Sequence, residues 1–279
     1  MSESIFLADD ASSPEGERVQ PTEQARGPWD PQALHGGAPA ALMAAAFERL
    51  EPGAQLRIAR LGFEYLRPVP MAPLRLSARI VRPGRRVQEL AGTLSADVSS
   101  GVEEVVCRAS ALRVREIGED VPACEQPPAI GDTRGPATLP PPDTATAMRF
   151  SLDGSTHASF AATAMEMRWL DDPKALGPGR VWMRLRHPLL AGQELTPLAR
   201  LAATADFGNG VSATLPFERF LFINADLTIH LQRPPRGEWI GLDARTLLHR
   251  AGTGLAESVL HDLDGPVGRA FQTLVVQSR

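Results

Sequence analysis

The sequence predicts an α+β fold made of two similar halves, each an alanine-rich helix followed by an antiparallel sheet. Two runs, APAALMAAAF and PLARLAATADFGNG, have the composition of helices, and alternating apolar and polar residues follow each of them. An Arg-Pro pair stands at a corresponding point in each half, at Arg67-Pro68 and Arg233-Pro234. These observations indicate a duplication with an offset of 166 residues (233 − 67).

The first segments lead into the first helix. Residues 1–30 are rich in Ser, Glu, Gln and Pro around a short apolar patch at residues 5–7, which predicts a strand followed by a loop. Gly36-Gly37 precede the first alanine-rich run and Pro52-Gly53 follow it, so we expect a helix of about four turns. Because this helix is apolar nearly all round, we expect a curved sheet to wrap it.

Period-two alternation then predicts an antiparallel meander with turns at residues 82–84 and 99–101. The residues predicted to share its inner faces are Leu74, Leu76, Ala78 and Ile80, then Leu90, Gly92, Leu94, Ala96 and Val98, then Val105, Cys107, Ala109 and Ala111. Residues 117–145 have few bulky apolar groups and many Pro, Gly and acidic residues. We therefore expect one domain at 1–116 with residues 1–30 as an arm, a linker at 117–145, and a second domain at 146–279.

The second half repeats the plan of the first. Its helix would bury the face formed by Leu198, Leu201, Ala202 and Ala205, with Asp206 one turn after Ala202. Four further segments have the pattern of strands: FLFINADLTIHLQRP, EWIGLDARTLLHR, GLAESVLHD and GRAFQTLVVQ. The repeat offset places Asn224 opposite Ile58 and Asp226 opposite Arg60, so the two halves have diverged at their polar positions while keeping their apolar ones.

Several strings carry a family resemblance: GGAPAAL, FEYLRPVP, RPGRRVQ, ADFGNG, DLTIHLQRP, EWIGLDA and GRAFQTL. With them the chain resembles the thioesterase-like superfamily, and within it the bacterial acyl-CoA thioesterase II type, over nearly its whole length. The resemblance implies a double hotdog fold, in which each of two helices is wrapped by a curved antiparallel sheet. It also implies hydrolysis of a fatty acyl-CoA to free acid and CoA.

Composition narrows the class of protein. A net charge of −4 argues against a nucleic-acid partner, because phosphate binding requires a basic surface. Cys107 and Cys124 have no metal-ligand spacing around them, so we expect no metal, no cofactor, no disulfide framework and a cytoplasmic location. The acidic, Ser-rich start lacks the features of a signal peptide, and the first helix is too short to span a membrane.

The nucleophile is predicted to be water. A G-x-S-x-G motif is absent and the six His residues suggest no Ser-His-Asp order, which argues against a covalent acyl-enzyme. The resemblance implies that a helix Asp, a strand hydroxyl and a Gln on the last strand hold the attacking water. Asp206 and Gln272 match the first and the last, whereas Asn224 stands where the family usually has Thr or Ser. Asn donates and accepts hydrogen bonds, but it cannot pass a proton through a hydroxyl.

The residues themselves leave alternatives for these positions. An acid at a helix C-terminus is disfavoured by the helix dipole, so Asp206 either has a functional reason or bonds loop amides. Gln272 would share an apolar face with Ala270, Leu274 and Val276, unless this strand is an edge strand with that face exposed.

Other residues are candidates for binding the substrate. The resemblance implies an oxyanion site at the helix start, formed by His35, Gly36 and Gly37, although the two glycines equally allow close helix packing. We expect the acyl tail to contact Met43, Phe47 and Phe207. Alternation along one strand would place Thr228 on the face of Asn224, and Asp226 is expected to form an ion pair near the Arg233-Pro234 corner.

The leading hypothesis is therefore an acyl-CoA thioesterase with one competent site per chain. The alternatives are a non-catalytic acyl-CoA or acyl-carrier binding protein and, less favoured because His157, His187 and His261 lack a spaced Asp partner, a hydratase or dehydratase. A homodimer or higher homo-oligomer is expected, because hotdog units commonly associate through their sheets.

Overall fold

The structure is a computed structural model that describes residues 4–13, 16–51, 55–97, 101–116, 138–148 and 157–279. Its α-helices are α1 (Gly37–Arg49), α2 (Pro197–Ala205) and α3 (Gly208–Val211), with shorter helical segments η1 (Glu23–Ala25), η2 (Pro142–Thr144) and η3 (Phe160–Ala164). The strands are β1 (Phe6–Ser13), β2 (Gly16–Pro21), β3 (Leu56–Tyr65), β4 (Leu74–Arg82), β5 (Val87–Asp97), β6 (Glu103–Arg115), β7 (Thr146–Ala147), β8 (Met165–Trp169), β9 (Gly179–Leu185), β10 (Phe220–Asn224), β11 (Asp226–Leu231), β12 (Ile240–His249), β13 (Thr253–Asp262) and β14 (Gly265–Ser278).

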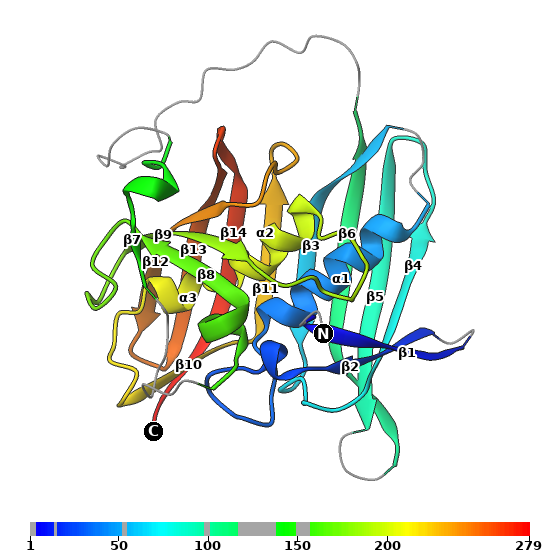
Figure 1. Cartoon of the computed structure of the whole chain (residues 1–279), viewed down its shortest axis with the longest axis horizontal. Coiled ribbons are helices and arrows are strands. Elements are labelled where there is room, and N and C mark those ends of the chain that lie inside the picture. The colour runs from blue at the N-terminus through cyan, green and yellow to red at the C-terminus, as the bar shows by residue number, and fades with distance from the viewer. Residues whose placement is uncertain (1–3, 14–15, 52–54, 98–100, 117–137, 149–156) are drawn as a thin grey trace.

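All of these strands belong to one sheet. Its order is β1-β2-β4-β5-β6-β3-β11-β14-β13-β12-β9-β8-β7, with β10 paired to β14. The pairings between its strands are antiparallel, and β3 pairs with β11 at the centre, with Leu61 opposite Ile229. The α1 and α2 helices contact each other and lie side by side in front of the sheet (Figure 1). The predicted α+β plan of two helices wrapped by antiparallel strands is confirmed.

The α1 helix is buried because strands surround it. Alanines that point in different directions, such as Ala38, Ala40 and Ala41, have no exposed surface, so the β4–β6 strands approach the helix backbone closely. Gly92 in β5 is part of this fit: a Cβ atom there would stand 2.3 Å from Cε of Met43. The apolar residues on all sides of α1 are therefore explained by its enclosure between its own sheet and α2.

A β-bulge changes one predicted face of the meander. Leu94 pairs with Cys107 but Ser95 pairs with Val105, so β6 contains one extra residue. As a result Val106 is completely buried and Val105 is only partly buried. The prediction that Val105 shares the inner face was wrong, because strict alternation does not continue through a bulge.

The second alanine-rich helix is interrupted at Asp206. The α2 helix ends at Ala205 with Asp206 as its C-cap, and α3 begins at Gly208. The side chain of Gln272 occupies the break: its Nε2 donates to the Asp206 carbonyl oxygen at 3.0 Å, and its Oε1 accepts from the Asn209 backbone N–H at 3.0 Å. An inserted side chain is a common cause of such a helix break.

A second interruption separates β10 from β11. Asn224 pairs with the buried Leu274 and points inward, whereas two strand positions later Asp226 faces outward opposite Glu64. Asp226 Oδ1 accepts the Thr273 N–H at 2.6 Å. The inner face of β11 is consequently made by the odd-numbered residues Leu227, Ile229 and Leu231.

The N-terminal arm differs from its prediction. Residues expected to form a loop make β2, which pairs with β1 and with β4. Val19 of β2 is 2% exposed, and this burial compensates for the polar composition of the segment. The N–H groups of Ile5 and Phe6 donate to carbonyl oxygens of residues 188 and 189, which ties the arm to the second half. Residues 117–137 of the predicted linker lie outside the described residues.

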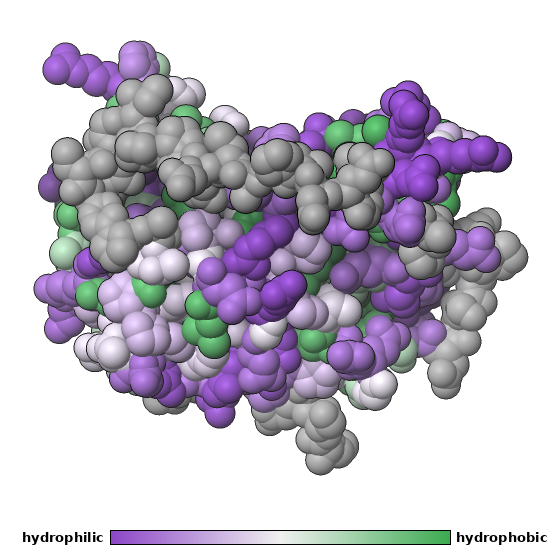
Figure 2. All heavy atoms as spheres, turned by 90° about the horizontal axis from the view of Figure 1, so that it is seen from above, coloured by the Kyte–Doolittle hydropathy of each residue, from purple (hydrophilic) through white to green (hydrophobic). Residues whose placement is uncertain are grey.

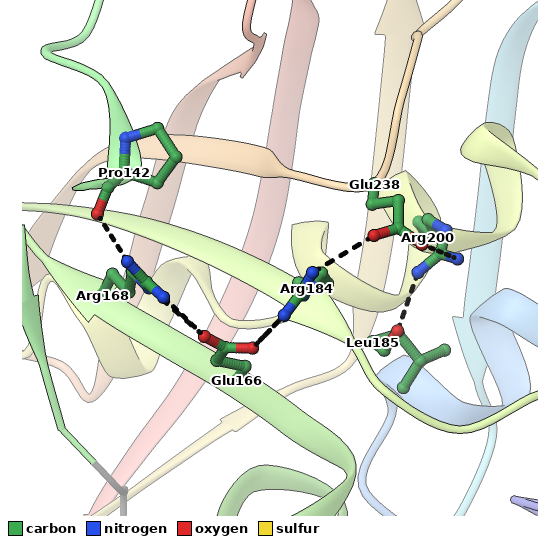
Figure 3. A network of polar contacts seen from close by, with 7 residues as sticks. All are labelled: Pro142, Glu166, Arg168, Arg184, Leu185, Arg200 and Glu238. Atoms are coloured by element: carbon green, nitrogen blue, oxygen red, sulfur yellow. Dashed lines mark hydrogen bonds and ion pairs between the residues drawn. The ribbon is translucent and has the colours of Figure 1, made fainter.

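A network of ion pairs connects α2 to the strands of the second half (Figure 3). The Glu166 carboxylate on β8 contacts Arg168 at 3.2 Å and Arg184 on β9 at 2.6 Å. Glu238 joins Arg184 to Arg200 of α2, at 3.2 and 3.1 Å. Both Arg168 and Arg184 also lie over the Trp239 ring, so the network has aromatic support beneath its charges. It holds one side of α2 in place.

The distribution of hydrophobic residues over the surface and along the helices fits the mixed composition of the chain. On the face shown in Figure 2, hydrophobic groups lie in small patches separated by hydrophilic ones. None of the described helices has the length and hydrophobicity needed to cross a membrane.

Cys107 is a free, fully buried thiol, and burial, followed by the nearby carboxylates of Glu64 and Asp206, raises its pKa to about 12. Cys124 lies outside the described residues.

Candidate active site

A buried carboxylate lies where the end of α2 meets the start of α1. Asp206 is 3% exposed. Its Oδ1 accepts a 2.8 Å hydrogen bond from Asn224 Nδ2, and its Oδ2 lies 3.1 Å from Nδ1 of His35. Within the described residues no Lys or Arg pairs with it. Burying a carboxylate without such a partner costs free energy, which the hydrogen bonds of the surrounding polar groups offset.

Gly36 allows the two helices to meet at this point. It is the N-cap of α1, and a Cβ atom on it would stand 2.7 Å from Oδ2 and 2.9 Å from Oδ1 of Asp206. Any larger residue would therefore displace the carboxylate. The first half of the chain thus provides Gly36, against which the carboxylate packs, and the second half provides Asp206.

Gln272 supports Asp206 from the sheet. It is 1% exposed and lies on β14 between β11 and β13, so the strand is internal and this face is covered. Its Nε2 donates to the Asp206 carbonyl and lies 3.5 Å from Oδ1 of the same residue. Asp206, Asn224 and Gln272, which come from three elements, are thus brought together by the fold.

His35 has two neighbours on the same ring nitrogen. Its Nδ1 accepts the Gly37 N–H at 3.0 Å and also lies 3.1 Å from Asp206 Oδ2. A ring nitrogen accepts when it is unprotonated and donates when it is protonated, so Nδ1 can serve only one of these groups at a time. The ring is stacked on Phe207 with centroids 4.2 Å apart, which fixes its plane. His35, Gly37 and Asp206 therefore form a proton-dependent contact.

Tyr65 is a site residue that the sequence analysis missed. Its hydroxyl donates to the Gly36 carbonyl oxygen at 2.9 Å, and burial, followed by the carboxylate of Asp206, raises its pKa well above the ordinary value. The hydroxyl consequently stays protonated and holds the helix start in place. The signal was present, because Tyr65 is the only tyrosine of the chain and continues the inward alternation of Leu61 and Phe63.

Three of the predicted binding residues lie elsewhere. Thr228 pairs with Phe271, whose neighbour Gln272 points inward, so Thr228 faces away from Asn224. The interruption at residue 225 reverses the alternation, which makes the Thr228 prediction wrong. Met43 and Phe47 are fully buried in the first-half core, where they pack near Gly92.

Among the described residues, Asp226 also lacks the ion pair that was expected of it. Its carboxylate accepts the Thr273 N–H instead, and its backbone oxygen accepts from Asn224 Nδ2 at 3.2 Å. Arg233 pairs with the buried Asp262 at 2.5 Å. The Arg-Pro corner is therefore closed by an acid from β13, not from β11.

A narrow pocket begins beside the site. Its lining residues are Pro28, Trp29, His35, Met167, Trp169, Met183, Phe207, Asn209, Gly210, Val211 and Phe217. The predicted contacts His35 and Phe207 belong to it. Its volume of about 40 Å³ suffices for only a few non-hydrogen atoms. Aromatic rings and thioethers make most of the wall, so the pocket suits an apolar or flat group.

A second, larger pocket lies at the opposite end of the helix pair. It has a volume of about 270 Å³ and includes Glu48 at the end of α1, together with Ile58, Arg113 and Pro197. Glu48 accepts a 2.5 Å hydrogen bond from Thr196, which caps α2, and burial raises its pKa. Glu48 thus has a hydroxyl partner in Thr196, but Ile58, which the repeat places opposite Asn224, provides no amide at this end.

The His, Cys, Asp and Glu residues in the described part of the chain form no group of three or more that could hold a metal ion.

Two family models match the two halves in order. The acyl-CoA thioesterase N-terminal domain matches residues 25–114, and the acyl-CoA thioesterase C-terminal domain matches residues 134–276. The sequence has no significant match among curated proteins.

Solved structures share the fold at low identity. A putative thioesterase II from Thermobifida fusca YX is 17% identical with a TM-score of 0.70, covering 97% of this chain and 95% of that chain. A protein of unknown function with a hot dog fold from Alicyclobacillus acidocaldarius is 18% identical with a TM-score of 0.68, covering 96% and 95%. The acyl-CoA thioesterase II TesB2 from Mycobacterium marinum is 16% identical with a TM-score of 0.63, covering 98% and 96%. With both domains matched in order and this arrangement of strands and helices, the chain has a double hotdog fold and belongs to the acyl-CoA thioesterase family.

Proposed function

We propose that the protein hydrolyses an acyl-CoA thioester to a free acid and CoA, using a water molecule activated by Asp206. The observation that carries the proposal is the buried Asp206 carboxylate, which has no Lys or Arg partner among the described residues and is contacted by Asn224 and His35. A fold that retains such a costly group beside an apolar pocket has a reason to use it as a base.

The reaction follows from the groups around this carboxylate. Asp206 accepts a proton from water as the water oxygen bonds to the thioester carbonyl carbon. The negative charge that develops on the carbonyl oxygen is stabilised by amide N–H groups at the start of α1, where the helix dipole favours an anion. The C–S bond then breaks, and the thiolate takes the proton held by Asp206 to leave as CoA.

His35 regulates one of these amides. When Nδ1 accepts the Gly37 N–H, that donor is occupied; when Nδ1 is protonated, it donates to Asp206 and the Gly37 N–H is released. A proton that reaches Nδ1 therefore makes one more donor available for the carbonyl oxygen.

Asn224 takes the place of the hydroxyl that the family resemblance implies. Its amide N–H holds Oδ1 of Asp206 at 2.8 Å, so the carboxylate keeps a fixed orientation without a hydroxyl. Gln272 fixes the backbone of the same residue. Because Asn224 and Gln272 are amides that do not exchange a proton with the substrate, Asp206 is the one of these three groups that transfers the proton.

The test is release of free thiol from short, medium and long acyl-CoAs, compared between the wild type and Asp206→Asn. The amide keeps the shape of the side chain but removes the base, so kcat should fall by about 10²- to 10⁴-fold with little change in KM. Asp264→Asn is the matched control, because Asp264 is 61% exposed and lies outside the site. It should retain wild-type activity.

The competing function is a non-catalytic acyl-CoA or acyl-carrier binding protein. It predicts that neither protein releases thiol while acyl-CoA still raises the melting temperature of both. That result would overturn the hydrolase proposal. Full activity in Asp206→Asn would instead overturn the assignment of the base.

A further inference from the structure

One residue of the narrow pocket beside the site has a buried hydrogen-bond donor with no partner among the described residues. Trp169 lines it and is 5% exposed, and the indole Nε1–H is buried without a hydrogen-bond partner among the described residues. A buried N–H without an acceptor costs about 1–3 kcal/mol. Most buried donors have partners, so this one requires an explanation.

The indole N–H of Trp169 has no acceptor among the described residues, although a comparable indole N–H nearby forms a hydrogen bond. Trp182 on the adjacent β9 strand is 1% exposed, and its Nε1 donates to the Pro140 carbonyl oxygen at 2.6 Å. Trp169 ends β8 on the inner face, in the same alternation as Met165 and Met167. Its side chain is therefore held on the pocket side of the strand.

The pocket shares walls with the groups that surround Asp206. His35 lines the pocket, contacts the carboxylate and stacks on Phe207, which also lines the pocket. Asn209 forms another part of the wall, and its backbone N–H is bonded to Gln272. A group attached to a carbonyl carbon at Asp206 has this pocket next to it.

We propose that the pocket holds the acyl group of the substrate, and that this group is short and carries an oxygen acceptor toward its far end, which Trp169 Nε1–H recognises. The inference rests on the proposed thioesterase function and names its substrate class. The 40 Å³ volume restricts the number of atoms, while the rings and thioethers of the wall favour an apolar chain or flat group leading to the acceptor. A keto, hydroxyl or ether oxygen supplies the acceptor.

The experiment compares thioesters that differ only in the distal oxygen. Propanoyl-CoA is paired with 3-hydroxypropanoyl-CoA, and butanoyl-CoA with 3-oxobutanoyl-CoA, so that the acyl groups match the small pocket, and kcat/KM is measured for each with the wild type and Trp169→Phe. The phenyl ring keeps an aromatic wall but has no N–H. The wild type should prefer the oxygenated member of at least one pair by about 5- to 100-fold, which corresponds to one satisfied buried donor.

In Trp169→Phe this preference, taken as the ratio of kcat/KM within each pair, should fall to about one, whatever the rate for the plain partner. Trp182→Phe is the control for replacing a buried tryptophan, since Trp182 does not line the pocket, and its preference should equal that of the wild type. Circular dichroism and the melting temperature of each variant establish that it is folded.

The outcomes separate the two proposals. If plain thioesters are hydrolysed but the oxygenated members are not preferred, or if Trp169→Phe keeps the preference, the acceptor inference is overturned and the thioesterase proposal stands. Hydrolysis of none of the thioesters by the wild type overturns the proposed function and the inference with it.

Discussion

Asn224 is the residue at which this site departs most from the family pattern. Its amide donates to the Asp206 carboxylate and to the Asp226 carbonyl oxygen, so one side chain orients the base and stabilises the gap between β10 and β11. A hydroxyl can donate only one hydrogen bond. In place of the single donor of the hydroxyl that the family resemblance implies, Asn224 therefore makes two hydrogen bonds.

Replacement of Asn224 should separate these roles. Asn224→Ala removes a hydrogen bond to a charged group, worth about 1.5–3 kcal/mol, so kcat should fall by about 10- to 100-fold with a smaller change in KM. Asn224→Thr restores one donor and should keep kcat within about tenfold of the wild type. Steady-state kinetics on the best substrate of the acyl-CoA panel measures both, and an Ala variant with wild-type kcat would contradict the role.

His261 makes stability depend on pH. It is 4% exposed, and burial lowers its pKa to about 4. Between about pH 6.5 and 4 the unfolded chain binds a proton that the folded protein does not, so stability falls as the pH falls through this window. The contribution should be about 2 kcal/mol lost between pH 7 and pH 5.

His261→Gln should remove this part of the pH dependence, as measured by urea unfolding at both pH values. His230→Gln, at an exposed position of β11, should leave the wild-type dependence unchanged. An unaltered slope in His261→Gln would show that other groups cause the acid sensitivity.

Sequence patterns predicted individual residues well where the elements are regular. Alternation placed Gln272 on a covered face with Ala270 and Leu274, as the structure has it. Thr228 and Val105 were misplaced because a strand interruption and a β-bulge each reverse the alternation, and neither leaves a signal in local hydrophobicity. The unpaired donor of Trp169 depends on contacts between distant strands, which no pattern contains.

At the scale of elements, each long helix ends against a polar side chain from the sheet. Gln272 of β14 donates to the carbonyl oxygen of Asp206, the C-cap of α2. At the end of α1, Arg113 of β6 donates to the carbonyl oxygens of Phe47, Leu50 and Glu51. Helix C-termini leave such oxygens without intrahelical partners. In both halves, a side chain from the sheet therefore satisfies carbonyl oxygens at the end of the helix.

Arg113→Met should destabilise the fold by about 2–3 kcal/mol, because several buried carbonyl oxygens lose a charged donor. Arg115→Met on the same strand is the matched control, because Arg115 is exposed. Among the described residues its guanidinium donates to the side chain of Gln55, while its backbone N–H bonds the Arg86 carbonyl oxygen, which the substitution does not change. Its loss should therefore cost less than about 0.5 kcal/mol of stability. Chemical denaturation gives both values. Equal stabilities of the two variants would contradict the capping role.

Helix existence was easier to predict than helix ends. The start of α1 at the glycine pair and its length follow from composition, and α1 runs from Gly37 to Arg49. The break after Ala205 was not foreseen, since it results from Gln272 inserting from 66 residues away. Long-range hydrogen bonds decide such ends, and propensity does not include them.

At the scale of the whole molecule, the site is assembled from both halves of one chain. His35, Gly36 and Tyr65 belong to the first half, while Asp206, Asn224 and Gln272 belong to the second. The β3–β11 pairing and the strand hydrogen bonds of Ile5 and Phe6 hold the halves together. The double hotdog plan was predictable because it is repeated in the sequence; the domain limits, the cytoplasmic location and a homodimer or higher assembly stay predictions.

Dilution should not reduce activity. Because the described site requires no second chain, the rate per chain should be constant from micromolar to nanomolar protein, even if the protein dissociates from a larger assembly. Initial rates measured over this range, with size-exclusion chromatography at each end, test this. A fall in rate that follows dissociation would show that a neighbouring chain contributes to the site.

The continuous β3–β11 ladder has a further consequence for inheritance. Two identical subunits acquire every substitution twice, so a change that improves one site alters its symmetry mate as well. A single gene that encodes both units is free of this constraint. Asn224 could therefore arise in the second half while the corresponding position of the first half, Ile58, stayed apolar.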